Sequence, residues 1–520
     1  MRLSAKSISA PAVGLLVLSG VIFSLLYLQF FFNWPRNEDL ELLDTVRGWN
    51  DHSMSMLDLL ETRNGDHPIG MQSAAHLAIF EFLGVNFRNV IVFNHTVLIA
   101  SGLALFAAVR GALSTIAACI IAVLISAVFF HPIQTNNLLW PFQTGWFLID
   151  LAFVLNILLI ERLGWKGLPA LVVTGAVATL SSRHGVFVWF VAAFHLTLLG
   201  GRGNRLAALV MFAGFAAGLL LAPSTDAHLP GVADVGGLIV YSIALVGGTF
   251  GDRDPAWALG LGAIVLACAV VAVGKIALDA KTSRALDPVD RATLVLILAS
   301  GLCVAAFALG RYANGLGWVF DRFHAATTMI PLLLGLCLWW GRLAAVSSGL
   351  RRVVSALPVL LILASAGTAL PFARERSRDD YRQRALAMLA TCGAEPRSDV
   401  LLAGIHGFSV DEQIVARNMA ALKRLCGEHS PSKKMELYAQ YPDRFLALEK
   451  RNPAWASALH ALWDVYYVRL DLQDAFPIDS ADLPDHLVQF AAGDAREGSH
   501  YEPASLGPHG KTYLALADAL

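Results

Sequence analysis

The sequence predicts an α-helical polytopic membrane protein of about eleven transmembrane helices, followed by a C-terminal soluble domain. Two observations carry this prediction. The 520 residues are 56% hydrophobic and only 15% charged, whereas soluble domains contain about 25% charged residues. Long apolar runs also recur along the first 371 residues, and about 20 apolar residues are needed to cross a bilayer as a helix.

The charge balance excludes other classes of protein. Lys and Arg number 39 and Asp and Glu number 40, so there is no basic surplus for nucleic acid and no acidic solvating tail. Only six cysteines occur, which is too few for a disulfide-rich scaffold of this length.

Eleven apolar runs bounded by charge, glycine or proline are the predicted spans. They lie near residues 9–32, 89–109, 112–130, 143–160, 167–181, 185–200, 206–222, 256–274, 292–310, 325–341 and 353–371. The first is too long for the core of a signal peptide, so we interpret it as an uncleaved span. The run 236–249 is short for a span, and we interpret it as a re-entrant or interfacial segment.

Basic residues indicate the orientation. If the N-terminus is cytoplasmic, every inner turn is basic, including the stretch 275–291, as the positive-inside rule requires. Counting 236–249 as a span would break this pattern. The outer loops are then residues 33–88, 131–142, 182–184, 223–255 and 311–324. Aromatic anchors cluster at the same outer boundary, at Trp34, Trp140, Trp146, Trp189, Trp257 and Trp318.

From residue 372 to 520 the composition becomes charged, which predicts a soluble domain, and the odd number of spans places it on the outer face. Residues 399–407 read as a buried strand and 412–425 as an amphipathic helix, so an α or α/β fold is expected. Cys392 and Cys426 are the two cysteines of this domain. An oxidising compartment favours a disulfide between them, and two buried thiols are the alternative.

The remaining cysteines lie inside predicted spans, where a thiol behaves as a small apolar side chain. They are Cys119, Cys268, Cys303 and Cys337. No Cys or His spacing typical of a zinc site occurs.

Two carboxylates follow the first span directly. Glu38 and Asp39 would lie at the membrane surface, where a general base can deprotonate an acceptor hydroxyl. The structural alternative is that they cap the helix that follows, since acidic residues are favourable at a helix N-terminus.

Farther along the same loop, His67 precedes Pro68, a residue that can open a helix. The helix that follows has an apolar stripe, with Gln72 and His76 on its other side. This pattern favours a helix lying in the membrane interface. His67 is a candidate donor to a phosphate or a sugar, and a purely structural histidine is the alternative.

The second outer loop offers amides beside aromatic faces, the combination that a sugar ring requires. The candidate sugar or acceptor contacts are Asn137, Trp140 and Gln143. An aromatic belt with turn-forming Asn is the alternative interpretation.

Arginines mark the third and last outer loops. Arg183 and His184 lie in a tight turn, and Arg311 and Arg322 flank a glycine-rich stretch. Guanidinium binds phosphate bidentately and stays charged, so the three arginines are candidate phosphate ligands. Ion pairs within the loops are the alternative.

The known motifs for nucleotide phosphates and for a serine nucleophile are absent: GxxxxGK[ST], GxGxxG and GxSxG do not occur. The one DxD string, at 252–254, lies in a predicted outer loop and not on the cytoplasmic side. A nucleotide-sugar donor on the cytoplasmic side is therefore disfavoured.

The order of an acidic pair, then NGDHPIGMQSAAHLAIF, NNLLWPFQ, SSRHGVFVW and an Arg-rich loop resembles bacterial members of the GT-C glycosyltransferase superfamily over about residues 1–345. The resemblance implies inverting transfer of a sugar from a polyprenyl-phosphate donor to an envelope glycan or lipid. It implies a site on the outer face of the bacterial inner membrane, the periplasmic face on which the odd number of predicted spans also places the C-terminal domain.

The same resemblance implies that Asp39 is the base, with Glu38 as its competitor, and that Arg311 and Arg322 meet the lipid phosphate. The resemblance also makes a divalent cation, Mg²⁺ or Mn²⁺, the one cofactor to consider, since some superfamily members use one. The C-terminal domain, which the resemblance does not cover, would bind or orient the acceptor.

Two other functions stay open. A glycan polymerase or ligase would use a polyprenyl-diphosphate donor at the same arginines. A non-enzymatic transporter or scaffold would use the outer loops as a permeation mouth, but transporters tend to have internal repeats and midplane charges. In the predicted spans His95, Asp150 and His195 are the exceptional ionisable residues, and helix-packing hydrogen bonds are the simpler role for His95 and Asp150.

Overall fold

The computed structural model describes part of the chain. The described residues are 10–28, 31, 33–35, 38–64, 67–221, 234–248, 255–282, 286–312, 315–316, 319, 327–346, 366–367, 369–370, 373, 384, 417–419, 421–422 and 425. Arg322, Cys392 and Cys426, and most of the predicted span 353–371, lie outside them.

The chain forms two compact units. Unit 1 comprises Met1–Phe31 and Trp49–Ser377, and unit 2 comprises Phe32–Gly48 and Arg378–Leu520. The composition changes from apolar to charged at residue 372, close to Arg378, where the second stretch of unit 2 begins. No local sequence pattern indicated that part of the first outer loop belongs to this unit.

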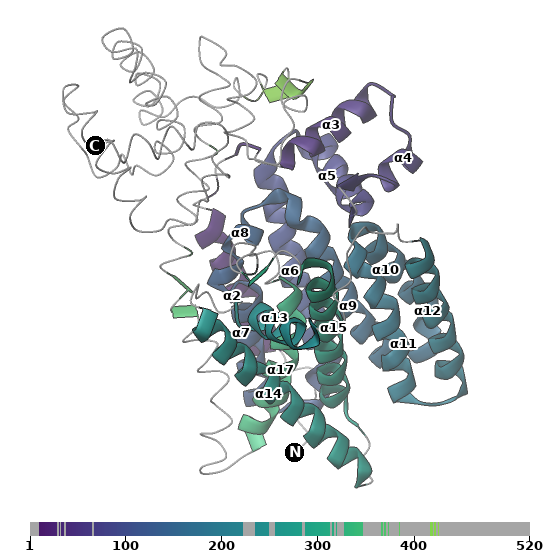
Figure 1. Ribbon diagram of the computed structural model, residues 1–520, viewed down its shortest axis with the longest axis vertical. Coiled ribbons are helices and arrows are strands. Elements are labelled where there is room, and N and C mark those ends of the chain that lie inside the picture. The colour runs from purple at the N-terminus through teal and green to yellow at the C-terminus, as the bar shows by residue number, and fades with distance from the viewer. Residues whose placement is uncertain are drawn as a thin grey trace, which may run out of the picture. The chain divides into compact units, whose positions relative to one another are not determined.

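Helices dominate the described residues (Figure 1). They are α2 (Ala10–Leu28), α3 (Asp39–Asn50), α4 (Met56–Leu60), α5 (Gly70–Leu83), α6 (Phe87–Val109), α7 (Thr115–Phe129), α8 (Thr135–Leu138), α9 (Thr144–Leu163), α10 (Leu168–Ser181), α11 (Phe187–Leu199), α12 (Arg202–Leu221), α13 (Val235–Gly248), α14 (Pro255–Lys281), α15 (Pro288–Arg311) and α17 (Ile330–Val346).

Short elements join these helices. The 3₁₀ turns are η1 (Arg110–Ala112), η2 (Pro132–Gln134), η3 (Pro141–Gln143), η4 (Gly164–Gly167) and η5 (Arg183–Val186). The strands β1 (Arg63–Asn64) and β2 (His67–Pro68) pair antiparallel. Pro68 therefore ends a hairpin rather than opening a helix, and α5 begins at Gly70.

The protein is a helical membrane protein by the length and composition of its helices. Six described helical stretches are long and apolar enough to cross a bilayer: Ala10–Leu28, Phe87–Ala112, Thr115–Leu138, Arg202–Leu220, Pro255–Lys281 and Pro288–Arg311. Helices also occupy the other predicted spans up to residue 341, but several are shorter or less apolar, so the total of eleven stays a prediction.

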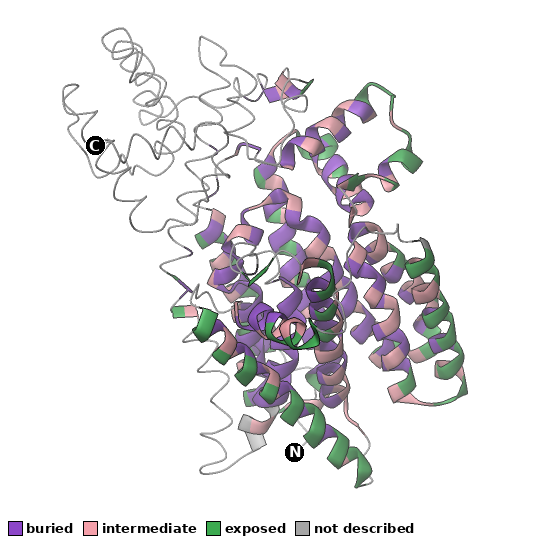
Figure 2. Cartoon of the chain, viewed as in Figure 1, coloured by how far each residue is buried: buried purple, intermediate pink, exposed green. Residues whose placement is uncertain are grey.

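The outward faces of the candidate spans are apolar, as contact with lipid requires. Ile116 of α7, Leu209 of α12 and Val270 of α14 are 70%, 66% and 71% exposed. Figure 2 shows continuous exposed faces along α12 and α14. In water such faces would be an association hazard.

Inside unit 1 the helices pack in pairs: α6 against α9, α11 against α12, α13 against α14, and α15 against α17. The α13–α14 pair depends on glycine. A Cβ atom at Gly247 would lie 1.6 Å from the Ala258 oxygen, and one at Gly262 would lie 2.0 Å from the Ile243 oxygen. Small residues thus let the two backbones touch. At 14 residues, α13 rises only about 21 Å, less than the bilayer core of about 30 Å.

A buried ion-pair network joins three helices of unit 1, α9, α11 and α15. Arg291 of α15 donates from Nε to Oε1 of Glu161 at 2.7 Å and from Nη2 to Oε2 at 2.6 Å. His195 Nε2 lies 2.8 Å from the same Oε1. The side chains of Glu161 and His195 are 5% and 0% exposed. This bidentate geometry fixes α9 against both α11 and α15.

His95 makes the helix-packing hydrogen bond expected of it. Its Nε2 lies 3.1 Å from the carbonyl oxygen of Leu138, which accepts the bond, so the proton is on Nε2. The ring also meets Phe130 edge-on at 5.6 Å.

Candidate functional site

Four rings from four separate segments meet in unit 1 and form what we call the aromatic cluster: His67 of β2, Trp146 of α9, His184 of η5 and Phe307 of α15. His184 lies at its centre. Its ring stacks on Phe307 at 4.6 Å with an interplanar angle of 16°, and it lies 4.9 Å from Trp146 and 6.3 Å from His67. Trp146 stacks on Phe307 at 5.7 Å. The cluster thus brings together the predicted site residues His67 and His184.

A glycine allows His184 to reach this position. The backbone of η5 folds directly onto the last turn of α10, and a Cβ atom at Gly185 would lie 1.8 Å from the carbonyl oxygen of Ala178. The turn is closed by the Gly185 amide, which donates to the Ser182 carbonyl at 2.8 Å. Any larger residue at 185 would push His184 away from Phe307.

Two of the predicted phosphate-binding arginines adjoin the aromatic cluster in sequence. Arg183 precedes His184 and is half-buried. Arg311 is the last residue of α15, four residues after Phe307, and is also half-buried. Residues four apart lie on one face of a helix. The next residue, Tyr312, packs its ring edge-on against that of Tyr241 of α13, with the ring centroids 5.9 Å apart.

A buried polar network links α5, α6 and α9. The Thr144 hydroxyl lies 2.7 Å from Asn94 Oδ1, 2.9 Å from the Pro141 oxygen and 2.6 Å from His76 Nε2. Both other groups are acceptors and the hydroxyl has one proton, so His76 Nε2–H donates to Thr144. Next to it, the Gly145 amide donates to Gln72 Oε1 at 3.0 Å.

Burial keeps His76 neutral. It lowers the pKa of the imidazole to about 3, although a hydrogen bond to the Pro141 backbone opposes the shift. Gln72 and His76 therefore face the protein, whereas Phe82 and Leu83 at the end of α5 are 86% and 63% exposed. Leu77 and Phe80 of the same helix are 5% and 4% exposed, so the apolar side chains that point outward are those at the end of α5.

Sequence reasoning missed Asn94 and Thr144 as members of this network. The one available signal was a polar side chain at membrane depth, which is costly unless it is paired. Thr144 is fully buried, as is Asn94.

The predicted sugar contacts of the second loop differ in exposure. Asn137 is 1% exposed and donates to Gln134 Oε1 at 2.6 Å and to Thr327 Oγ1 at 2.8 Å. Gln143 is 4% exposed. Trp140 is half-buried and lies 6.1 Å from the ring of Phe142. Of the three, Trp140 has the most surface for a ligand.

The predicted acidic pair lies in unit 2. Asp39 begins α3 and is fully buried, and its Oδ2 lies 3.2 Å from Nη1 of Arg384, which is also fully buried. Arg384 also donates to the carbonyl oxygen of Trp34. Glu38 precedes α3 and is half-buried.

The rest of α3 is bound by the same unit. Asp44 accepts from Arg417 Nη2 at 3.1 Å and from Asn418 Nδ2 at 2.9 Å. Burial, together with the charges of Glu38 and Asp44, raises the pKa of the Glu41 carboxyl to about 7. An acid–base group with this pKa was not predicted from the sequence, because nothing in the local pattern shows that α3 is covered.

Within the described residues, no three His, Cys, Asp or Glu side chains come together as a metal site would need. The described cysteines Cys119, Cys268, Cys303 and Cys337 are free thiols.

No protein-family model, no curated protein and no solved structure matches this chain. The fold itself defines the class as a helical membrane protein.

Proposed function

We propose that the protein transfers a sugar from a polyprenyl-phosphate donor to an envelope glycan or lipid, on the outer face of the bacterial cytoplasmic membrane and with inversion. The aromatic cluster is the observation that supports this proposal most. It joins His67 and His184, from two segments predicted to be outer loops, to Trp146 and to Phe307, which lies one helical turn before Arg311. A sugar needs flat apolar faces with hydrogen-bond donors at their edges, and this cluster offers both.

The arginines supply the charge that the reaction needs. When the acceptor oxygen attacks the anomeric carbon, the bond from that carbon to the phosphate oxygen breaks and the phosphate leaves with the electron pair. Arg183, Arg311 and Arg322 would stabilise the negative charge that develops there. Guanidinium suits this role because it stays protonated and binds phosphate bidentately.

A carboxylate would take the proton of the acceptor hydroxyl. Asp39 and Glu38 are the two candidates, and the buried ion pair of Asp39 with Arg384 supports Glu38 as the base, because the charge of Asp39 is already paired. Trp140, Asn137 and Gln143 remain the proposed sugar or acceptor contacts. A role for Mg²⁺ or Mn²⁺ and acceptor binding by the C-terminal domain belong to the same proposal.

The base is tested by transfer of radiolabelled sugar from extracted polyprenyl-phosphate sugars to envelope lipid and glycan. Glu38→Gln should lower the rate by about 10²-fold to 10⁴-fold. The double variant Asp39→Asn/Arg384→Gln removes both charges of the buried pair, so it should fold and keep most of its activity. An inactive, folded double variant with an active Glu38→Gln enzyme would assign the base to Asp39. Full activity in both would remove the acidic pair from the mechanism.

The arginines are tested in the same assay. Arg183→Gln and Arg311→Gln should each lower kcat/KM by about 10²-fold to 10³-fold. Arg88, an exposed arginine at the start of α6, is the matched control, and Arg88→Gln should transfer at the normal rate. Equal losses in all three variants would contradict a specific role for Arg183 and Arg311.

A further inference from the structure

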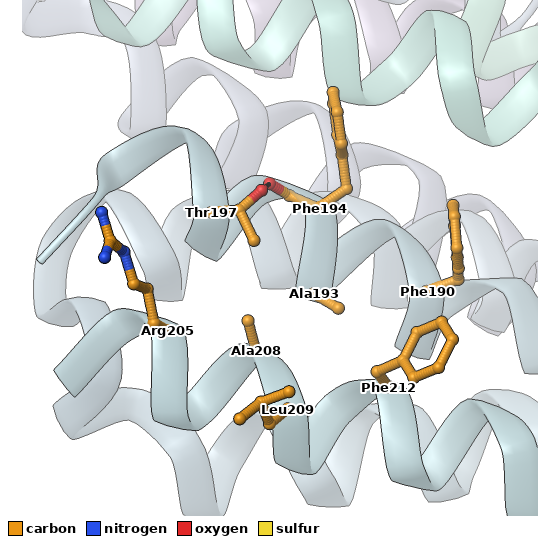
Figure 3. Close-up of a pocket in the computed structure, with 8 residues that line it drawn as sticks. All are labelled: Phe190, Ala193, Phe194, Thr197, Arg205, Ala208, Leu209 and Phe212. Atoms are coloured by element: carbon orange, nitrogen blue, oxygen red, sulfur yellow. Dashed lines mark hydrogen bonds between the residues drawn. The ribbon is translucent and has the colours of Figure 1, made fainter. Parts of the chain in front are cut away.

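An apolar groove lies between α11 and α12 of unit 1. Its cavity volume is about 440 Å³, and Figure 3 shows its lining. The lining residues are Phe190, Ala193, Phe194, Thr197, Arg205, Ala208, Leu209 and Phe212. The floor is made by two alanines from the facing helices, Ala193 and Ala208, which leave space that larger side chains would fill.

The two ends of the groove differ chemically. Arg205 lies at one end near Thr197, and the rings of Phe190 and Phe212 lie at the other (Figure 3). Arg205 and Phe212 are seven residues apart on α12, or roughly 10 Å along the helix axis. The groove thus runs from a cationic mouth to an aromatic end.

The mouth favours an anion. Arg205 and Arg202 are both exposed in the first turn of α12, where the helix dipole adds positive charge. None of the eight lining residues is acidic. The walls belong to the face of α12 that shows Leu206, Leu209 and Phe212 to the surroundings at 57%, 66% and 49% exposure, so the groove opens where lipid would lie.

We propose that this groove binds one acyl chain of a bilayer phospholipid whose anionic headgroup pairs with Arg205. The positive charge of Arg205 selects an anionic headgroup over a zwitterionic one. The acyl chain lies in the apolar part of the groove, between Arg205 and the rings of Phe190 and Phe212. This site is independent of the proposed transfer reaction, because it requires only that α11 and α12 lie in a membrane.

The test is native mass spectrometry of the full-length, delipidated protein with added phosphatidylglycerol or phosphatidylcholine of matched chains. The wild-type protein should bind phosphatidylglycerol about fivefold more tightly, which corresponds to about 1 kcal/mol for one basic residue at an anionic headgroup. Arg205→Gln should abolish this preference. Arg110→Gln, which changes another exposed arginine, should leave it intact.

Leu209→Trp fills the groove from an exposed position and should weaken binding of both lipids. An Arg205→Gln protein that still prefers phosphatidylglycerol would overturn the proposal, as would an equal loss in Arg110→Gln. Loss of a dimer in Leu209→Trp, with lipid binding unchanged, would show that a second copy of the chain occupies the groove instead.

Discussion

The carboxylate of Asp39 and the guanidinium of Arg384 are 3.2 Å apart, and neither side chain is exposed. The two residues are 345 positions apart in the chain, so this ion pair joins the start of α3 to the C-terminal part of unit 2. A buried charge that loses its partner costs far more than an exposed one.

Removing one member of this pair should therefore destabilise unit 2. Asp39→Asn and Arg384→Gln should each lower the free energy of unfolding by about 3–5 kcal/mol, and the double variant should recover most of the loss. The free energy of unfolding of unit 2 is measured by limited proteolysis at increasing denaturant concentration, with cleavage of the C-terminal region as the readout. Additive losses in the double variant would mean that the two charges do not interact.

We expect a similar effect in unit 1 when the buried ion-pair network of Glu161 is broken. Glu161→Gln should lower the free energy of unfolding in detergent by about 3 kcal/mol, because it leaves Arg291 without its bidentate partner. The control is the exposed pair of Lys275 and Asp279 on α14. Asp279→Asn should change stability by less than about 0.5 kcal/mol, and similar effects in the two variants would contradict the importance of burial.

The pH dependence of unit 2 should reflect Glu41. Its pKa is raised in the folded state from 4.5 to about 7, so between these values the folded state binds more protons than the unfolded one. Stability should then fall as pH rises from about 4.5 to about 7. Urea titrations of the wild-type protein and Glu41→Gln at pH 5 and pH 7.5 test this. The variant should show a smaller difference between the two pH values.

His76 should give the opposite sign of pH dependence in unit 1. Its folded pKa is lowered from 6.5 to about 3, so the unfolded state binds the proton first as pH falls below 6.5. Stability should drop by on the order of 1 kcal/mol per pH unit between about 6 and 4. Thermal unfolding measured across this pH range should show a weaker pH dependence of stability in His76→Gln than in the wild-type protein. The same pH dependence in both proteins would mean that His76 is accessible to protons in the folded state.

The six candidate spans were predictable because a lipid-facing helix must be apolar along its length, as Leu209 and Val270 illustrate. His67, His184 and Arg183 stand out as polar residues in their predicted loops, and the structure brings the rings of His67 and His184 together. Phe307 was not, because an apolar ring within an apolar span gives no signal. The partner of Asp39 was equally hidden, since no local pattern connects it to Arg384.

For α5, the sequence pattern identified a polar side and an apolar side but not which of the two is covered by protein. The polar side of this helix was visible in the sequence at Gln72 and His76. Only the positions of Asn94 and Thr144 on neighbouring helices show that this side is covered by protein and that the apolar end at Phe82 is the exposed one.

The most direct test of the proposed function is native mass spectrometry of the detergent-purified protein, which identifies the headgroup of any polyprenyl lipid that remains bound. We expect a polyprenyl-monophosphate sugar on the wild-type protein and its loss in Arg183→Gln and Arg311→Gln. A bound diphosphate oligosaccharide would indicate a polymerase or ligase instead. If no polyprenyl lipid binds even when one is added, the protein is not a transferase that uses a polyprenyl-linked donor.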